Sequence, residues 1–268
     1  MAAPSCPVIW RVAPEPADTQ DLQRSLGCSR IAAILLTQRG VETEAQAREF
    51  LSPSFDALAD PTLLPDAVKA VRRLMVALDH HERIYVYGDY DADGITAAAL
   101  WTRLLQQLGG DVCTQVPHRR RDGYDLRNKV VKAARDAGAK LIVTADCGIQ
   151  RHEEVQTAKC LGLDVIVTDH HEVGATLPGA VAVVNPHRPD SQYPFRDLAG
   201  VGVSYRLAEA LVRAVGLPVD KYRRAFSDLA AIGTVTDIMP LLGDNRVFVR
   251  TGLHRMSDTQ RKGLRALM

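Results

Sequence analysis

Short apolar runs alternate with longer amphipathic segments through the middle of this 268-residue chain. The runs are rich in β-branched residues, which is typical of buried strands. They cover residues 83–89, 111–117, 140–146, 164–169 and 180–186. Amphipathic segments of about 10–15 residues separate the first four runs, as in βαβ units. We therefore predict an α/β fold with a mainly parallel sheet and helices on both faces.

Helical patterns precede and follow this region. Apolar residues recur at helical spacing in five further segments. These segments are residues 18–40, 43–53, 66–82, 200–216 and 222–235. We expect Thr43 to be the N-cap of the second. The sequence predicts three parts: a helical segment over residues 1–80 packed on the core, a sheet domain over 81–245, and a helix beginning in 246–268.

The composition is that of an ordinary soluble protein, with 46% apolar and 24% charged residues. A net charge of +1 excludes a chain that is polybasic throughout, so any nucleic-acid contact must come from a local basic patch. The five cysteines are odd in number and form no CxxC pair, which favours a reduced, cytoplasmic protein. We find no signal-peptide pattern and no apolar run near the ~20 residues of a membrane helix.

Three of the predicted strands end in an aspartate: Asp89, Asp146 and Asp169. The carboxyl ends of parallel strands meet at one edge of a sheet, where ligands bind in open α/β folds. Asp91 and Asp93 follow Asp89 at every second position. We expect these carboxylates to gather in one crevice.

Two histidines and a further acid extend this group. His170 and His171 follow the third strand directly, and Asp237 comes after a later apolar stretch. Crowded, desolvated carboxylates take up either protons or cations. Aspartate and histidine without thiolates suit Mn²⁺ or Mg²⁺, and a pair of such ions about 3.5–4 Å apart is the usual clamp for phosphoester hydrolysis. The sequence therefore predicts two divalent ions.

Simpler interpretations of these residues exist. "DYDADG" (89–94) matches the first six positions of an EF-hand loop, but Leu100 stands at position 12 and a strand comes first. A solvated acidic turn would not follow a buried strand. Asp237 alone is as consistent with a helix cap as with a ligand. Adjacent histidines on a strand point to opposite faces, so they have different roles unless the chain turns there.

Candidate substrate contacts lie in two further places. Residues 117–127 are either a solvated basic loop or a phosphate-binding loop with a base stacked on Tyr124. The arginines of this loop are Arg119, Arg120, Arg121 and Arg127. Gly200 and Gly202 open a helix, where they provide either a backbone anion cradle or close helix packing.

Taken together, these motifs resemble the DHH phosphoesterase superfamily and, within it, the RecJ single-strand exonucleases. The motifs are "GDYDADG" (88–94), "PHRRRDGY" (117–124), "TADCGI" (144–149), "TDHHE" (168–172), "NPHRPDS" (185–191), "LAGVGVSYRL" (198–207) and "GTVTDIMPLLGDNR" (233–246). "LAGVGV" and "GTVTD" favour RecJ over smaller relatives.

The resemblance implies a role for individual residues. The implied metal ligands are Asp91, Asp93, Asp146, His170 and Asp237, with Asp89 as a further ligand of the first ion. It implies that Asp146 bridges the two ions and takes part in catalysis, and that His171 acts close to the scissile phosphate. Arg119 and Tyr124 match the second motif, whereas Arg120 and Arg121 do not. We add Gly200 and Gly202 as predicted substrate-binding residues.

The implied activity is that of a 5′→3′ exonuclease core that releases 5′-mononucleotides from single-stranded DNA in repair and recombination. The polarity rests on the resemblance alone. We expect a monomer with no membrane association, and a single-strand-binding protein or a helicase as partner. The alternatives are a phosphoesterase for short oligonucleotides, cyclic dinucleotides or pyrophosphate, and a non-catalytic DHH scaffold.

RecJ proteins continue into a DHHA1-type domain and an oligonucleotide-binding fold, which this sequence lacks. Under this interpretation residues 81–245 are the DHH catalytic domain, and 246–268 begin a helix that connects to a missing C-terminal region.

Overall fold

The computed structural model describes residues 9–16 and 19–268, which fall into two compact units, Met1–Ser54 and Phe55–Met268. Cys6 and the start of the predicted helix over 18–40 lie outside the described residues. The predicted boundary near residue 80 differs from this division. The chain from Phe55 onward belongs to the larger unit because its helix packs into that unit's core, where Leu74 is fully buried.

The smaller unit contains three short helices: α1 (Thr19–Leu26), α2 (Arg30–Thr37) and α3 (Glu44–Leu51). The predicted single helix over 18–40 is broken in two at Gly27, which has a φ of +62°. Ser29 then caps α2 by accepting the Ala32 N–H, so the local turn chemistry overrides the continuous apolar pattern. The prediction for Thr43 is confirmed, since it forms a capping box with Gln46.

The larger unit is built on a five-stranded sheet in which every neighbouring pair is parallel. Its strands are β1 (Ile84–Gly88), β2 (Val112–Gln115), β3 (Leu141–Ala145), β4 (Asp164–Thr168) and β5 (Ala182–Val184). Their spatial order is β2-β1-β3-β4-β5. This confirms the predicted parallel α/β fold.

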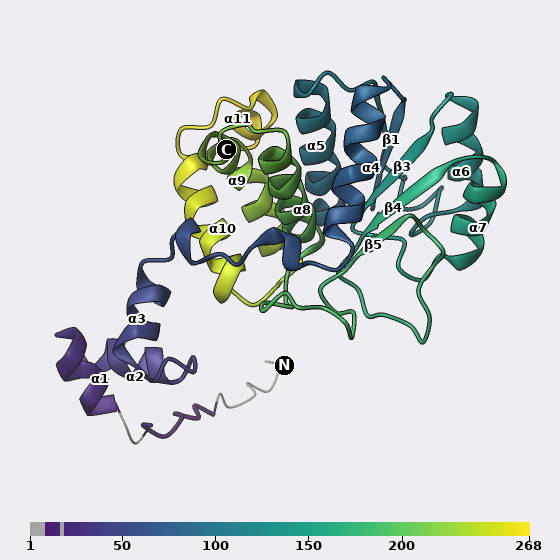
Figure 1. The fold of residues 1–268 in the computed structure, drawn as a ribbon. Helices are drawn as coiled ribbons and strands as arrows, with labels where there is room; N and C mark the ends of the chain where they lie inside the picture. Colours follow the sequence, from purple (N-terminus) through teal and green to yellow (C-terminus); the bar gives the residue numbers. More distant parts are fainter. Residues whose placement is uncertain (1–8, 17–18) are drawn as a thin grey trace, which may run out of the picture. The chain divides into compact units, whose positions relative to one another are not determined.

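Helices cover both faces of the sheet (Figure 1). The helices of the larger unit are α4 (Ala67–Asp79), α5 (Ala92–Gln107), α6 (Asn128–Asp136), α7 (His152–Cys160), α8 (Gly200–Ala214), α9 (Val219–Thr236), α10 (Gly243–Met256) and α11 (Lys262–Leu267), with short 3₁₀ turns at Phe55–Ala57 and Pro61–Leu63. In β1, Ile84 and Val86 pack toward α4, α5 and α8, whereas Tyr85 and Tyr87 pack toward α6 and α7. The alternation follows from the two-residue period of a strand, and it explains why β1 and β3 are buried along their whole length.

The C-terminal helices complete the core on the α5 and α8 side. Helix α10 packs closely against α9 and contributes the fully buried Phe248. The predicted helix after residue 245 therefore begins slightly earlier and belongs to the same unit. Within the described part of the chain, no helix has the length and apolar character needed to cross a membrane.

A buried charge network fastens α8 to its surroundings. Arg206 and Glu209 are both fully buried. Glu209 pairs with Arg206 and, at 2.8 Å, with Arg223 of α9, while Arg206 also donates to Tyr193 Oη and to the Ala59 carbonyl before α4. The network thus ties three separate segments to one helix.

Replacing Glu209 by Ala should destabilise the fold strongly. The substitution leaves buried guanidinium groups without their carboxylate, which costs about 3–5 kcal/mol of unfolding free energy. Urea unfolding followed by circular dichroism measures this. Asp111→Ala is the control, because its pair with Arg83 is about half exposed and should be worth less than about 1 kcal/mol. Equal losses in the two variants would contradict a stabilising role for the network.

Candidate metal centre

The acidic crevice lies where the order of the sheet reverses. From β1 the chain proceeds to β2 on one side and then to β3 on the other, so the carboxyl ends of β1 and β3 flank a topological switch point. Asp89 directly follows β1, and its N–H donates to Ala145 at 3.1 Å. Asp146 directly follows β3, and its N–H donates to Thr168 at 3.0 Å. These hydrogen bonds of the sheet therefore fix the backbone positions of Asp89 and Asp146.

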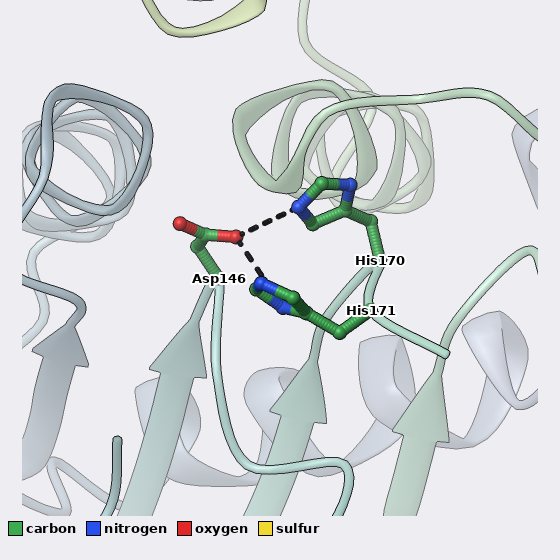
Figure 2. A group of neighbouring side chains, drawn as sticks. All are labelled: Asp146, His170 and His171. Atoms are coloured by element: carbon green, nitrogen blue, oxygen red, sulfur yellow. Dashed lines mark ion pairs between the residues drawn. The ribbon is translucent and has the colours of Figure 1, made fainter. Parts of the chain in front are cut away.

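The backbone at Asp146 turns its carboxyl group into the crevice. Its φ is +67°, in the left-handed region that costs energy for any residue except glycine. Figure 2 shows the carboxyl facing both histidines: Oδ1 lies 3.2 Å from His170 Nε2 and 4.0 Å from His171 Nδ1. Helix α8 begins against the same group, since a Cβ at Gly200 would lie 2.4 Å from Oδ1.

The spacing of the "DYDADG" motif has a structural reason. Asp89 ends the strand, Asp91 caps α5 by accepting the Gly94 N–H at 3.0 Å, and Asp93 sits in the first helical turn. Gly94 is required because a Cβ there would lie 2.5 Å from the Asp89 nitrogen. A strand end, a cap and a first turn thus bring three carboxylates to one place, and no calcium loop is formed.

Asp93 is also held from the opposite side. Its two carboxylate oxygens accept the N–H groups of Gly200 at 2.6 Å and Val201 at 2.8 Å, at the start of α8. The positive end of the helix dipole favours a negative charge at this point. Asp93 therefore links the first turns of α5 and α8.

The two histidines face the same crevice because the chain turns immediately after β4. Asp169 makes this turn by accepting the N–H groups of His170 and His171 and, from Cys147's loop, that of Ile149. Its Oδ1 also lies 2.7 Å from His171 Nδ1, which orients that imidazole. Sequence reasoning placed Asp169 at the rim but missed this supporting role, although its position directly before the two histidines was a signal for it.

The acids and histidines form three overlapping groups whose ligand atoms lie within 4.8 Å of one another. The groups are Asp89–Asp91–Asp146, Asp93–His170–Asp237 and Asp146–His170–His171. All six predicted metal ligands belong to these groups. Asp237 is both the C-cap of α9 and a member of the cluster, with Oδ2 3.5 Å from His170 Nε2.

Three carboxylate oxygens in these groups show that the donor set fits a cation. Asp89 Oδ1, Asp146 Oδ1 and Asp237 Oδ2 are buried and accept no hydrogen bond. Buried acceptors without a donor are costly, whereas a divalent ion satisfies them directly. Carboxylates and imidazoles without thiolate are ligands that suit Mn²⁺ or Mg²⁺.

Comparison with known proteins agrees with this geometry. The profile of the DHH family, N-terminal domain, matches residues 83–234, which include all of the strands and nearly all of the cluster. The chain belongs to the DHH family. This confirms the family predicted from the motifs.

The DHH domain here is similar to that of RecJ proteins. The chain is 39% identical over 260 residues to the single-stranded-DNA-specific exonuclease RecJ of Bacillus subtilis, covering 97% of this chain and 32% of that protein. The structure resembles Thermus thermophilus RecJ in complex with Mn²⁺, with a TM-score of 0.80 and 34% identity over 96% of this chain and 36% of that one. The T. thermophilus complex with Mg²⁺ has a TM-score of 0.69 at 31% identity, covering 96% and 33%. The chain thus spans about a third of the length of these relatives.

Burial gives the acids of the DHH site unusual proton affinities. It raises the pKa of Asp93 and Asp146 well above the usual range, the pKa of Asp89 to about 6, and that of Asp237 by a smaller amount. Neighbouring carboxylates raise the first three further. Without a bound cation, each of these groups therefore gives up its proton at a higher pH than an ordinary aspartate does.

The Asp169–His171 pair behaves in the opposite way. Burial opposes ionisation of Asp169, but the hydrogen bonds and charge of His171 outweigh it and lower the pKa of Asp169. The hydrogen bond to Asp169 in turn raises the pKa of His171 to about 9. The pair is therefore a carboxylate and an imidazolium at neutral pH.

A patch of aromatic rings and one arginine adjoins this pair. Tyr124 Oη lies 3.3 Å from His171 Nε2, and the Tyr124 ring makes an edge contact with Tyr90 at 6.1 Å between centroids. The Arg119 guanidinium lies 5.0 Å from the Tyr90 ring centre. Sequence reasoning missed Tyr90, although an aromatic residue between two strand-end acids was a visible signal.

The other arginines of residues 117–127 have different partners. Arg121 pairs with Asp122, which also accepts the His118 N–H, while Arg127 donates to the Tyr124 carbonyl. Arg119 has no carboxylate partner among the residues that the structure describes. That Arg119 and Tyr124, rather than Arg120 and Arg121, contact the substrate stays a prediction.

The structure favours close packing over substrate binding for the two glycines of α8. Gly200 and Gly202 are both buried. The Gly200 N–H is taken by Asp93, and Gly202 packs near Leu198 and Phe248. The small size of the two glycines lets α8 approach the acids, while their predicted role in substrate binding stays a prediction.

Mn²⁺ should stabilise this protein more at pH 8 than at pH 5. Since the folded pKa of Asp89 is about 6 against an ordinary 3.8, the metal-free fold loses stability as pH rises through this range. Bound Mn²⁺ offsets the free-energy cost of ionising the buried Asp89, and at pH 8 fewer protons compete with the ion for the carboxylates. Scanning fluorimetry at a hundredfold excess over Kd should show a Tm increase of about 5–10 °C at pH 8. An equal increase at pH 5 would argue against the titrating acids as ligands.

Asp169→Asn should lower the pKa of His171 from about 9 toward its ordinary value of 6.5. The amide keeps the shape of the carboxylate but not its charge, so the imidazolium loses its partner. Titration of the histidine ring protons by NMR measures the shift. Asp164→Asn, at the other end of β4, is the matched control and should leave that titration unchanged. A His171 pKa that stays near 9 in the first variant would contradict the assignment.

Proposed function

We propose that this chain is the core of a metal-dependent exonuclease that hydrolyses single-stranded DNA. The observation that carries the proposal is the cluster of acids and histidines at the β1–β3 switch point, with three buried carboxylate oxygens that accept no hydrogen bond. The substrate class comes from the similarity to single-stranded-DNA-specific RecJ exonucleases.

Two divalent ions, Mn²⁺ or Mg²⁺, fit this donor set. Asp89 and Asp91 would hold one ion, and Asp93, His170 and Asp237 would hold the other. Asp146 shares one group with Asp89 and Asp91 and another with His170, which supports a bridging role. When bound, such ions lower the pKa of water and offset charge on a phosphate.

His171 is suited to contact the phosphate. It is held by Asp169, it is protonated at neutral pH, and its side chain is 42% exposed. An imidazolium placed in advance can donate a hydrogen bond to phosphate oxygens as their negative charge increases. Asp169 keeps the ring in position and in its charged form.

Arg119, Tyr90 and Tyr124 form the adjoining substrate surface. The arginine supplies charge for a phosphate, and the exposed tyrosine edge supplies a platform for a base. Since Tyr124 also contacts His171, a strand bound here leads directly to the acids.

The direction and setting of the reaction are further parts of the proposal. We propose 5′→3′ polarity, release of 5′-mononucleotides, and a role in DNA repair and recombination. We further propose a cytoplasmic monomer that works with a single-strand-binding protein or a helicase. End-labelled single strands, duplexes and dinucleotides, each tested with Mn²⁺, distinguish this activity from hydrolysis of small phosphoesters.

Asp146→Ala should abolish Mn²⁺-dependent hydrolysis of single-stranded DNA. It removes a carboxylate that belongs to two of the three groups, so both ion positions lose a ligand. Release of labelled nucleotide measures activity, and calorimetry measures Mn²⁺ uptake. Hydrolysis at the wild-type rate in this variant would overturn the proposed mechanism.

Arg119→Ala should raise KM for single-stranded DNA about tenfold, since one charge-assisted contact to a phosphate is lost. Arg120→Ala is the matched control, because this neighbour is equally exposed but does not stack on Tyr90. We expect it to change KM less than threefold. Equal effects of the two substitutions would indicate a diffuse basic loop instead of a specific contact.

A further inference from the structure

Helix α9 ends beside the metal centre with an unusual residue. Asp237 is its C-cap, and Ile238 follows with a φ of +58°. Two backbone hydrogen bonds close the helix end: Ile238 N–H to Val235 O and Met239 N–H to Thr234 O, both at 3.2 Å. This is a Schellman motif, in which the left-handed residue is usually glycine. A β-branched residue at positive φ is a genuine outlier.

The same chain uses glycine at this position in other helices. Helices α5, α6, α7 and α8 end with the same pair of hydrogen bonds and a glycine with φ between +72° and +82°. Those glycines are Gly109, Gly138, Gly162 and Gly216. The end of α9 therefore differs from the ends of these four helices, and its left-handed residue is β-branched.

Packing in the hydrophobic core does not explain why residue 238 is an isoleucine. Its side chain is 89% exposed, so it contributes almost nothing to the core. Ile238 thus combines backbone strain with an apolar side chain in water, and neither stabilises the folded state. Residues held in such conformations cluster at functional sites.

The position of Ile238 indicates what it contacts. It is adjacent in the chain to Asp237, whose carboxylate shares a ligand group with Asp93 and His170. Val235, one turn earlier on α9, is also half exposed. A strand whose phosphate reaches the acids would therefore lie close to this apolar edge, and isoleucine is one of the side chains that proteins insert between bases.

We infer that Ile238 is a substrate-binding residue, whose side chain packs as an apolar wedge against the base next to the scissile phosphate. This inference rests on the proposed function. The wedge holds the terminal nucleotide apart from the next base and so positions the phosphate between them. The left-handed backbone is what turns the side chain outward at the edge of the acidic crevice.

Ile238→Gly tests this with opposite effects on stability and binding. Glycine relieves the strain, so Tm should stay equal or rise, while KM for a single strand should increase about tenfold with little change in kcat. Anisotropy with a labelled oligonucleotide in the absence of metal gives a second measure of binding. Ile238→Val keeps a β-branched apolar side chain and should restore KM to within about twofold of wild type.

His81→Gly is the matched control. His81 is exposed, has a φ of +52°, and closes α4 with the same pair of hydrogen bonds, but it lies outside the acidic groups. The substitution should change Tm as Ile238→Gly does and leave KM unchanged. A strand that lacks bases at its terminal positions should reduce the KM difference between Ile238→Gly and wild type.

Two results would overturn the inference. An unchanged KM in Ile238→Gly would leave the edge free for a protein partner and exclude the wedge, and a KM increase that persists on the abasic strand would exclude contact with a base. Failure of the proposed function is a different result, since wild-type protein would then neither bind nor cleave single strands.

Discussion

Several carboxylates, three of them buried, lie close together at one edge of the sheet, and the surrounding helices offset the free-energy cost of gathering their charges. Asp93 and Asp146 are almost completely buried, and burial is the main reason that the pKa of each is raised well above its usual value. Three features accommodate these carboxylates: backbone N–H donors from α8, a left-handed turn at Asp146, and imidazoles at the end of the neighbouring strand. A bound divalent cation would offset the negative charge that these groups leave uncompensated.

The acidic cluster also requires that three helices approach it closely. Cβ atoms at Gly94, Gly200 and Gly233 would each lie 2.5 Å or less from a backbone or carboxylate atom of Asp89, Asp146 or Asp93. The glycines therefore belong to the site. They allow α5, α8 and α9 to bring their ends to one point, where each helix contributes or supports an acid.

Sequence reasoning succeeded where function depends on periodicity. Short apolar runs predicted the parallel strands, and the acids that follow them predicted the crevice. It failed where local geometry decides: Gly27 and Ser29 break a continuous helical pattern, and Asp169 supports His171 through a turn that the strand pattern did not predict. Residues 79–82 show the limit clearly, because they read "DHHE" like residues 169–172 but lie at the end of α4 and join none of the described acidic groups.

Helix α8 carries two separate duties along its length. Its first turn supports the acids through Gly200 and Val201, and two turns later Arg206 and Glu209 hold neighbouring segments together. Because both features belong to one continuous helix, the contacts of Arg206 and Glu209 also help to fix the position of its first turn beside the acids. Changes in its first turn would yield folded but inactive protein, whereas changes at the buried pair would deplete the folded population itself, so a mutational scan along this one element would separate chemistry from architecture.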